Sequence, residues 1–305
     1  ANSMVIHNAG MDNQATIDLM VANGRKALAE LEKLSQEQID AICKHCLQEF
    51  VKVGEELAKE AVEETGLGSV EYKIMKNCGT PTGVWYAIKG LKTRGIIGHD
   101  EKHHLTFVAH PKGIIAGVIP TTNPNMTVLV NGIYALKGAN VLMFAPHPRA
   151  KISTAHTCEI LEKAIQEMGG PANVFQCVDA PNMELTQMMM SAADTVLGTG
   201  GPGMVKAAYS SGKPAYGVGA GNSQSIDPEF GDLSGALDRF LMGNTFDNGI
   251  VCACNRCIIA PKSMTADILK LLKEKHVHYI DDPKVVDQIR NVCFPNGFGK
   301  LNGDV

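Results

Sequence analysis

The sequence of 305 residues lacks any long uninterrupted apolar run and any long run of basic residues. A membrane-spanning helix needs about 20 consecutive apolar residues, so the sequence predicts no transmembrane segment and no membrane partner. Lys and Arg total 28 against 32 Asp and Glu, which gives a formal net charge of −4. This charge balance does not predict a basic surface for binding nucleic acid. Aromatic residues make up only 5% of the chain, with Trp85 as its single tryptophan, which argues against a stacking platform for single strands.

Paired cysteines of the kind that staple small secreted domains are also missing. The nine cysteines are an odd number and are scattered over a long chain, which favours free thiols in a reducing compartment. The first residues contain neither a basic segment nor an apolar segment of a signal peptide. We therefore expect a cytoplasmic protein.

What is present is the composition of a soluble globular protein. Apolar residues account for 45% of the chain and charged residues for 20%. The length predicts one large or two ordinary domains.

The first hundred residues carry a helical period. Apolar residues recur at helical spacings over 17–34, and Ser35 followed by Gln38 is the capping-box pattern of a second helix. A third helix is expected from Glu55 to Glu64, ending at Gly66, a residue suited to the left-handed position after a helix. Alternating apolar residues within Gly98–Lys112 then indicate a strand.

From Lys112 onward, short apolar runs alternate with amphipathic stretches. The expected strands cover 113–120, 139–145, 173–178, 195–197 and 214–218, and the expected helices cover 126–137, 150–168, 183–193 and 202–211. Strands that alternate with helices of this length predict an α/β fold with a doubly wound parallel sheet. Ligands of such sheets bind at the carboxyl ends of the strands.

A second unit is expected after residue 243. We assign residues 1–243 to a first domain, for which the resemblance described below implies nucleotide binding, and residues 244–305 to the start of a second α/β domain. The second domain is expected to contain strands over 256–260 and 276–280 and a helix over 264–274.

A glycine-rich segment, Thr199-Gly200-Gly201-Pro202-Gly203, separates an expected strand from an expected helix. Glycines at this place allow a phosphate-bearing ligand to approach the helix N-terminus. The segment is not GxGxxG, and a tight strand–helix turn would explain it equally well.

Three cysteines, Cys252, Cys254 and Cys257, lie close together in the sequence. A zinc site usually needs four ligands, and this spacing supplies three, so no metal is expected. Cys252 lies in a loop directly before an apolar run, which allows a thiol to reach a cleft; a buried, purely structural thiol is the alternative.

Two further polar residues follow expected strands, Asn123 in PTTNPN and His147 in PHPRA. Asn123 is either a turn former or a side-chain amide directed at a developing oxyanion.

Four segments together resemble one protein family. IPTTNPNMT at 119–127, FAPHPRAK at 144–151, TGGPGMVKAAYSSGKPAYGVGAGN at 199–222 and FDNGIVCA at 246–253 resemble the CoA-acylating aldehyde dehydrogenases. This branch of the aldehyde dehydrogenase superfamily includes the aldehyde dehydrogenase half of bifunctional aldehyde–alcohol dehydrogenases and the acylating sulfoacetaldehyde dehydrogenases. The resemblance implies an NAD domain, a catalytic domain and an oligomerising arm that contains the hairpin near 98–112. It also implies a homodimer or a higher homo-oligomer.

The resemblance implies roles for individual residues. Cys252 corresponds to the nucleophile, and Asn123 corresponds to the amide that holds the oxyanion. The positions implied to bind NAD or coenzyme A are Pro120, Thr121, Thr122, Pro146, His147, Thr199, Gly200, Gly201, Gly203, Val218 and Gly219.

The implied reaction converts a small aldehyde, CoA and NAD into acyl-CoA and NADH through a thiohemiacetal and a thioester on Cys252. Hydrolytic relatives place a Glu general base in a segment that here is Val218-Gly219-Ala220-Gly221-Asn222, without a carboxylate. A missing base disfavours activation of water and favours acyl transfer to CoA. A catalytically impaired nucleotide-binding or scaffold subunit of the same fold remains the alternative function.

Two departures from the family pattern bear on activity and substrate. The family continues well beyond the position of Val305, so the chain alone is expected to be poorly active. Arg256 and Asn125 are polar where the family pattern is less so, which suggests an anionic aldehyde such as sulfoacetaldehyde, with acetaldehyde as the alternative. Arg256 could equally point to solvent or pair with Asp247.

Overall fold

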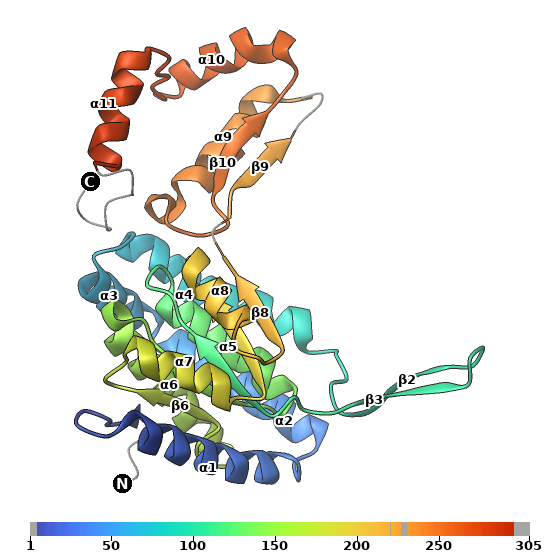
Figure 1. The fold of residues 1–305 in the computed structure, drawn as a ribbon. Helices are drawn as coiled ribbons and strands as arrows, with labels where there is room; N and C mark the ends of the chain where they lie inside the picture. Colours follow the sequence, from blue (N-terminus) through green and yellow to red (C-terminus); the bar gives the residue numbers. More distant parts are fainter. Residues whose placement is uncertain (1–4, 220, 227–230, 296–305) are drawn as a thin grey trace. The chain divides into compact units, whose positions relative to one another are not determined.

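A computed structural model describes residues 5–219, 221–226 and 231–295 of the chain (Figure 1). These residues form two compact units. Unit 1 contains Ala1–Thr65 and Val70–Ala220, and unit 2 contains Gly66–Ser69 and Gly221–Val305. Unit 2 therefore takes four residues from a much earlier part of the chain.

Unit 1 alternates helices and strands as the sequence predicts. Its elements are β1 (Val5–Ile6), α1 (Asn13–Leu31), α2 (Gln36–Lys52), α3 (Gly54–Thr65), α4 (Val70–Ile88), β2 (Gly95–Asp100), β3 (Leu105–Ala109), β4 (Ile114–Val118), α5 (Pro124–Lys137), β5 (Val141–Ala145), a 3₁₀ turn (Pro148–Ala150), α6 (Lys151–Glu167), β6 (Phe175–Val178), α7 (Met183–Ala192), β7 (Thr195–Thr199), α8 (Pro202–Tyr209) and β8 (Ala215–Val218). The capping box at Ser35 and the left-handed Gly66 are both present, as predicted.

The core of unit 1 is a six-stranded sheet in the order β1-β6-β5-β4-β7-β8, with every pair of neighbours parallel. β4, β5 and β6 follow one another in one direction, and the chain then returns to place β7 on the other side of β4. The predicted doubly wound parallel sheet is therefore confirmed, and its topological switch point lies between β4 and β7.

Helices cover both faces of this sheet. On β6, Gln176 donates to the Met20 carbonyl of α1 at 3.0 Å, while the ring of Phe175 lies next to Gly132 of α5. Because successive strand residues point to opposite faces, α1 and α5 lie on opposite sides. Gly24 allows α1 to approach closely, since a Cβ there would lie 3.0 Å from Ile114 Cδ1.

The start of β4 depends on a positive-φ glycine. Gly113 has φ +113°, and a Cβ at this position would lie 2.1 Å from Asp194 Oδ2. Asp194 accepts from the Ile114 amide at 2.8 Å and from the Arg25 guanidinium in a two-pronged contact at 2.5 and 2.7 Å. This arrangement anchors the central strand to α1.

A long hairpin formed by β2 and β3 extends from unit 1 (Figure 1). The strands pair antiparallel, with Gly95 opposite Ala109 and Asp100 opposite Leu105. The strand predicted within Gly98–Lys112 is therefore one half of a hairpin.

Unit 2 is built around a two-stranded parallel sheet. Its elements are β9 (Ser223–Ile226), α9 (Leu233–Thr245), a helical turn (Phe246–Gly249), β10 (Asn255–Ile259), a 3₁₀ turn (Lys262–Met264), α10 (Thr265–Glu274) and α11 (Pro283–Cys293). Ser223 of β9 is paired with Asn255 of β10, and α9 packs against β10. Because β9 pairs with β10, the division between the units falls at residue 220, earlier than the domain boundary predicted at 243.

The sequence-based prediction was wrong at one place and incomplete at others. Residues 276–280 were expected to form a strand but have no regular structure. Within the described part of the chain, the sheet of unit 2 consists of β9 and β10 alone, so this segment pairs with neither strand. The sequence missed β1, α4, β9 and α11. Within the described ranges, no helix has both the length and the apolar character required to cross a membrane.

Candidate active site

The predicted binding residues of unit 1 follow neighbouring strand ends at one edge of the sheet. Val118, at the end of β4, is paired with Ala145 of β5 on one side and with Gly198 of β7 on the other. Thr199 of β7 is in turn paired with Val218 of β8. The segments 119–123, 146–147 and 200–203 therefore leave the sheet at the same edge, across the switch point where such folds bind ligands.

The glycine segment leaves the N-terminus of α8 open. Gly201 is the N-cap of α8 and makes no side-chain capping bond. A Cβ at Gly201 or Gly203 would meet nothing within 4 Å, and both residues are exposed. No side chain therefore caps the first amides of α8, and an uncapped helix N-terminus is the arrangement that favours a phosphate group. The segment thus fits the phosphates of a dinucleotide or of coenzyme A.

His147 caps the 3₁₀ turn that follows β5. Its Nδ1 accepts from the Arg149 amide at 3.1 Å, which assigns the remaining proton to Nε2. Partial burial, with a contribution from Arg149, lowers the pKa of His147 from its ordinary value. The ring therefore stays neutral at pH 7, and its Nε2–H is a donor at the binding edge.

Asn123 lies at the N-cap of α5, but its side chain makes no capping bond to the helix. Instead the Lys76 ammonium donates to Asn123 Oδ1. Its backbone has φ −146° and ψ 63°, and its side-chain oxygen is bonded to Lys76 of α4 and not to the first turn of α5. The amide is held by α4, a helix that the sequence analysis did not predict.

A second lysine on α4 binds the preceding residue. Lys73 is 3% exposed and donates to the Thr122 carbonyl at 3.0 Å. Neither lysine was a candidate from the sequence, because a lysine contact with a distant loop has no local pattern.

Asn125 is buried between α5 and α6. Its side-chain amide donates to Thr157 Oγ1 at 2.9 Å and to the Ser153 carbonyl at 3.3 Å. Both donor contacts are therefore used in helix packing, and the idea that Asn125 faces a substrate loses its basis. Its polarity is explained by the polar residues that α6 presents.

Cys252 is exposed in the loop between α9 and β10. The loop is closed by a turn in which the Cys254 amide donates to the Val251 carbonyl at 3.0 Å. The buried Cys254 thiol donates to the Phe246 carbonyl at 3.5 Å, and Arg256 donates to the Gly249 carbonyl. Cys252 precedes β10, so it does not share a strand face with Arg256.

The segment before Cys252 is fixed by an unusual backbone and a buried carboxylate. Asp247 and Asn248 have positive φ values of 53° and 55°. Asp247 is completely buried, and its Oδ1 accepts from the Ser69 amide at 2.8 Å, while Asn248 donates to the Gly68 carbonyl at 3.2 Å. The segment 66–69 thus anchors the loop that presents Cys252.

The glycine-rich segment after β8 approaches the same loop. A Cβ at Gly221 would lie 2.8 Å from the Cys252 carbonyl oxygen, so only glycine permits this approach. The segment brings no carboxylate to this place.

Of the nine cysteines, Cys43, Cys46, Cys158 and Cys177 are fully buried, and burial raises the pKa of each thiol. These four therefore stay protonated. Only Cys78 and Cys252 are exposed. Over the described residues, no three His, Cys, Asp or Glu side chains gather as metal ligands would.

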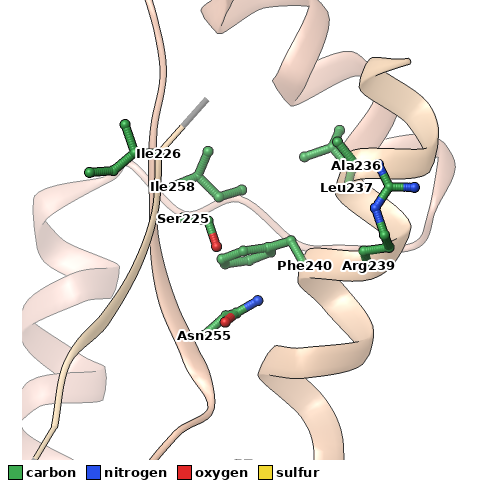
Figure 2. A pocket seen from close by; sticks show the side chains of 8 residues that line it. All are labelled: Ser225, Ile226, Ala236, Leu237, Arg239, Phe240, Asn255 and Ile258. Carbon is green, nitrogen blue, oxygen red and sulfur yellow. The ribbon is translucent and has the colours of Figure 1, made fainter. Parts of the chain in front are cut away.

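Unit 2 also contains a cavity of about 320 Å³ between α9 and the two strands (Figure 2). Figure 2 shows the side chains of Phe240 of α9 and Ile258 of β10 extending toward one another across it, while Ile226 points away from α9. No residue predicted for the site lines this cavity.

Comparison with known proteins identifies the family of the chain. Residues 1–286 match the aldehyde dehydrogenase family, and the chain belongs to that family. The family match, together with the relatives below, confirms the resemblance drawn from the four sequence motifs.

Two of the relatives are named as acetylating enzymes. The acetylating succinate-semialdehyde dehydrogenase of Clostridium kluyveri is 40% identical over 296 residues, which are 97% of this chain and 65% of the relative. A crystal structure of an acetylating aldehyde dehydrogenase from Geobacillus thermoglucosidasius superposes with a TM-score of 0.90 at 34% identity, covering 97% of this chain and 66% of that one. The propionaldehyde dehydrogenase of Rhodopseudomonas palustris, solved with bound propionyl-CoA, gives a TM-score of 0.82 at 27% identity, covering 97% of this chain and 68% of that one. The chain thus spans about two thirds of the length of these proteins.

Proposed function

We propose that the protein is a CoA-acylating aldehyde dehydrogenase that converts an aldehyde, CoA and NAD⁺ into acyl-CoA and NADH. The observation that carries the proposal is the exposed Cys252 thiol in a loop that is fixed on both sides and is approached by a segment without a carboxylate. The acetylating relatives support the same reaction.

In the proposed first step, the Cys252 thiolate attacks the aldehyde carbonyl carbon. A carbon–sulfur bond forms, and the carbonyl electron pair moves to oxygen. Asn123 donates its side-chain amide to this oxyanion, which requires Asn123 and Cys252 to meet at one carbonyl group. When bound, the nicotinamide supplies a hydride acceptor and CoA supplies the thiol that takes the acyl group from Cys252.

The cofactors would be held at the carboxyl edge of the sheet in unit 1. The open amides of α8 suit a phosphate group, and His147 Nε2–H suits a ribose or phosphate oxygen. We propose that NAD and CoA use this edge in turn, since both carry an adenine nucleotide.

The chain must also keep water from taking the acyl group. Hydrolysis needs a general base, and Val218, Gly219, Gly221 and Asn222 offer none. CoA brings its own strong nucleophile and needs no such base.

For the substrate, we propose a short aldehyde with a carboxylate or sulfonate group. The name of the succinate-semialdehyde dehydrogenase describes an anionic aldehyde of this kind. On the chain itself, the exposed Arg256 lies four residues after Cys252, and a guanidinium has five donors, more than its bond to Gly249 uses.

We also propose that the protein is a cytoplasmic homo-oligomer. All nine cysteines are free thiols, as a reducing compartment favours. The β2–β3 hairpin exposes several large apolar side chains: Ile96, Ile97, Leu105, Phe107 and Val108. An apolar ribbon of this kind gains stability by packing on a second copy of the chain.

The reaction is tested by following NADH and acyl-CoA with a panel of aldehydes in the presence and absence of CoA. We expect both products only with CoA and little free acid. Cys252→Ala should abolish both products and the acyl adduct detected on the intact protein, while Cys257→Ala should retain them. Rapid NADH formation with release of free acid in the absence of CoA would overturn the proposal.

A further inference from the structure

The helix α4 carries two lysines one turn apart that both contact the loop before α5. Lys73 donates to the Thr122 carbonyl and Lys76 donates to Asn123 Oδ1. Residues three apart lie on the same helix face, so one face of α4 supports two successive residues of the TTNP segment. The helix is itself anchored, because Asn77 is buried and donates to the Gly54 carbonyl at 3.0 Å.

The chemistry of the lysine determines the orientation of the Asn123 amide. An ammonium group has three donors and no acceptor, so only the amide oxygen can face Lys76. The two N–H groups of Asn123 therefore point away from Lys76. An asparagine without such a neighbour could turn its amide by 180° at little cost.

The contact with Lys76 also replaces the hydrogen bond that an N-cap asparagine usually makes. Such a side chain ordinarily accepts from a backbone amide of the first helical turn. Here the Asn123 oxygen is taken up by Lys76, and no side-chain cap is made. The amide is thus held off the helix with its N–H groups available.

The positive charge of the Lys76 ammonium group, bonded to the amide oxygen, also makes the two N–H groups of Asn123 stronger hydrogen-bond donors. Hydrogen bonds in a chain polarise one another, and a charged donor at one end increases the effect. The N-terminus of α5 adds a positive potential at the same place.

We propose that Lys76 is a positioning residue for Asn123, which it holds with the N–H groups presented to the oxyanion of the Cys252 adduct. This assignment rests on the proposed acylating dehydrogenase function. It predicts that Lys76 acts on the reaction only through Asn123.

The kinetic test is a double-mutant cycle with Lys76→Met, Lys76→Arg and Asn123→Ala, assayed for acyl-CoA formation. Loss of one oxyanion donor costs about 100- to 1000-fold in kcat, so we expect Asn123→Ala in that range and Lys76→Met at about 10- to 100-fold. KM should change less than about twofold, since a ground-state carbonyl makes a weaker bond than an oxyanion. Lys76→Arg should restore most of the loss, and Lys76→Met should add less than about threefold to Asn123→Ala. Lys89→Met, just beyond the end of α4, is the matched control and should stay near the wild type.

A second measurement does not depend on activity. In a protein labelled with ¹⁵N-asparagine, the side-chain amide signals of Asn123 are identified by their loss in Asn123→Ala. Lys76→Met should shift these signals and Lys76→Arg should return them toward their original positions. If Lys76→Met does not fold, Lys76→Gln, which keeps a neutral donor, takes its place and should give a smaller shift and a smaller kinetic loss.

Unchanged Asn123 signals in Lys76→Met would overturn the proposal, because Lys76 would then not hold the amide. Additive kinetic losses would overturn it as well, because Lys76 would then act independently of Asn123. An intact wild-type gene product that forms no acyl-CoA would instead overturn the proposed function and the catalytic role of the contact together, whatever the amide signals show.

Discussion

At the scale of single residues, the site depends on contacts that fix polar groups in place. Asn123 and Cys252 were both predicted from sequence motifs. The contacts that hold them, from Lys76 to Asn123 and from Ser69 to Asp247, were not. Each joins residues far apart in the sequence, so no local spacing could reveal it.

Arg256 is the residue on which substrate selectivity is predicted to depend. We expect Arg256→Gln to lower kcat/KM for succinate semialdehyde about 10- to 100-fold more than for butyraldehyde, an uncharged aldehyde of similar size. A charge-assisted hydrogen bond is worth about 1.5–3 kcal/mol, and the uncharged substrate makes no such bond. The measurement is initial NADH formation with both substrates.

The bond from Arg256 to the Gly249 carbonyl suggests an alternative role for Arg256, which is to support the loop that carries Cys252. If Arg256 only supports the loop, both aldehydes will lose kcat/KM equally, and the selectivity proposal falls. Lys262→Gln, which removes a positive charge after β10, is the control for a general loss of charge in unit 2.

At the scale of secondary-structure elements, the sequence predicted best where a helix or strand has a regular apolar period. The boundaries of β5, α6, β6, α7 and α10 lie within about two residues of those expected. The helix α4 was missed because its buried residues include Lys73, Asn77 and Pro81, which are not the residues of an apolar stripe. The strand β1 has only two residues, and it is stabilised by pairing with β6, which a local pattern does not show.

The junction between α6 and β6 is predicted to be pH-sensitive through Glu162. This carboxyl group is 1% exposed and accepts from the amides of Asn173 and Phe175. Burial raises its pKa from 4.5 to about 7, although the bonds from the backbone amides oppose the shift. The folded chain therefore binds this proton more tightly than the unfolded chain does.

It follows that the contribution of Glu162 to stability is greatest below about pH 4.5 and is lost as the pH rises to about 7. Over this window we expect the free energy of unfolding of the wild type to fall by about 1–3 kcal/mol relative to Glu162→Gln. Urea denaturation at several pH values measures the difference. Glu159→Gln on the same helix should parallel the wild type; a constant difference between wild type and Glu162→Gln from pH 4.5 to 7 would contradict the prediction.

The β2–β3 hairpin is predicted to hold the oligomer together. Phe107 and Val108 are each 48% exposed and point to opposite faces of the ribbon. We expect Phe107→Lys with Val108→Lys to reduce the molar mass found by light scattering to that of a smaller assembly, because charged groups resist burial at an interface. The circular dichroism spectrum should change little, since the hairpin lies outside the core of unit 1.

The charge at position 112, just after the hairpin, provides the comparison. Lys112→Glu changes charge near the hairpin without removing an apolar side chain, and the oligomer should persist. An unaltered molar mass in the double lysine variant would exclude the hairpin as the main contact.

At the scale of the whole molecule, the sequence predicted two α/β parts but not how the chain is shared between them. The predicted boundary at 243 followed the change of motif along the sequence. The actual division at 220, with the addition of Gly66–Ser69, follows the pairing of β9 with β10 and the contact of Asp247 with Ser69. A unit assembled from two distant parts of the chain cannot be predicted from local sequence patterns.

The discontinuity predicts that the two units can be destabilised separately. Asp247→Ala removes a buried acceptor of the Ser69 amide and places alanine at φ 53°, so we expect unit 2 to lose about 2–4 kcal/mol. Trp85, the single tryptophan, lies in unit 1, so its fluorescence reports on that unit alone. Thermal unfolding followed by circular dichroism should shift to lower temperature, while the tryptophan transition should move less.

Asp238→Ala is the matched control, because Asp238 is exposed and makes a surface ion pair with Lys275. A surface pair of this kind is worth about 0–1 kcal/mol, so little change is expected. Equal shifts of both probes in Asp247→Ala would show that the units unfold as one.

The bond between Ser69 and Asp247 also has a consequence for the order of events during synthesis. The two residues are 178 positions apart, so a ribosome adding about 5–20 residues per second makes Ser69 roughly 10–35 s before Asp247. During that interval, segment 66–69 has no partner in unit 2, and the sheet of unit 1 is able to form from contacts nearer in the sequence. Contacts of such long range are slow to close, so the setting of the Cys252 thiol is among the last features of the nascent chain to be completed.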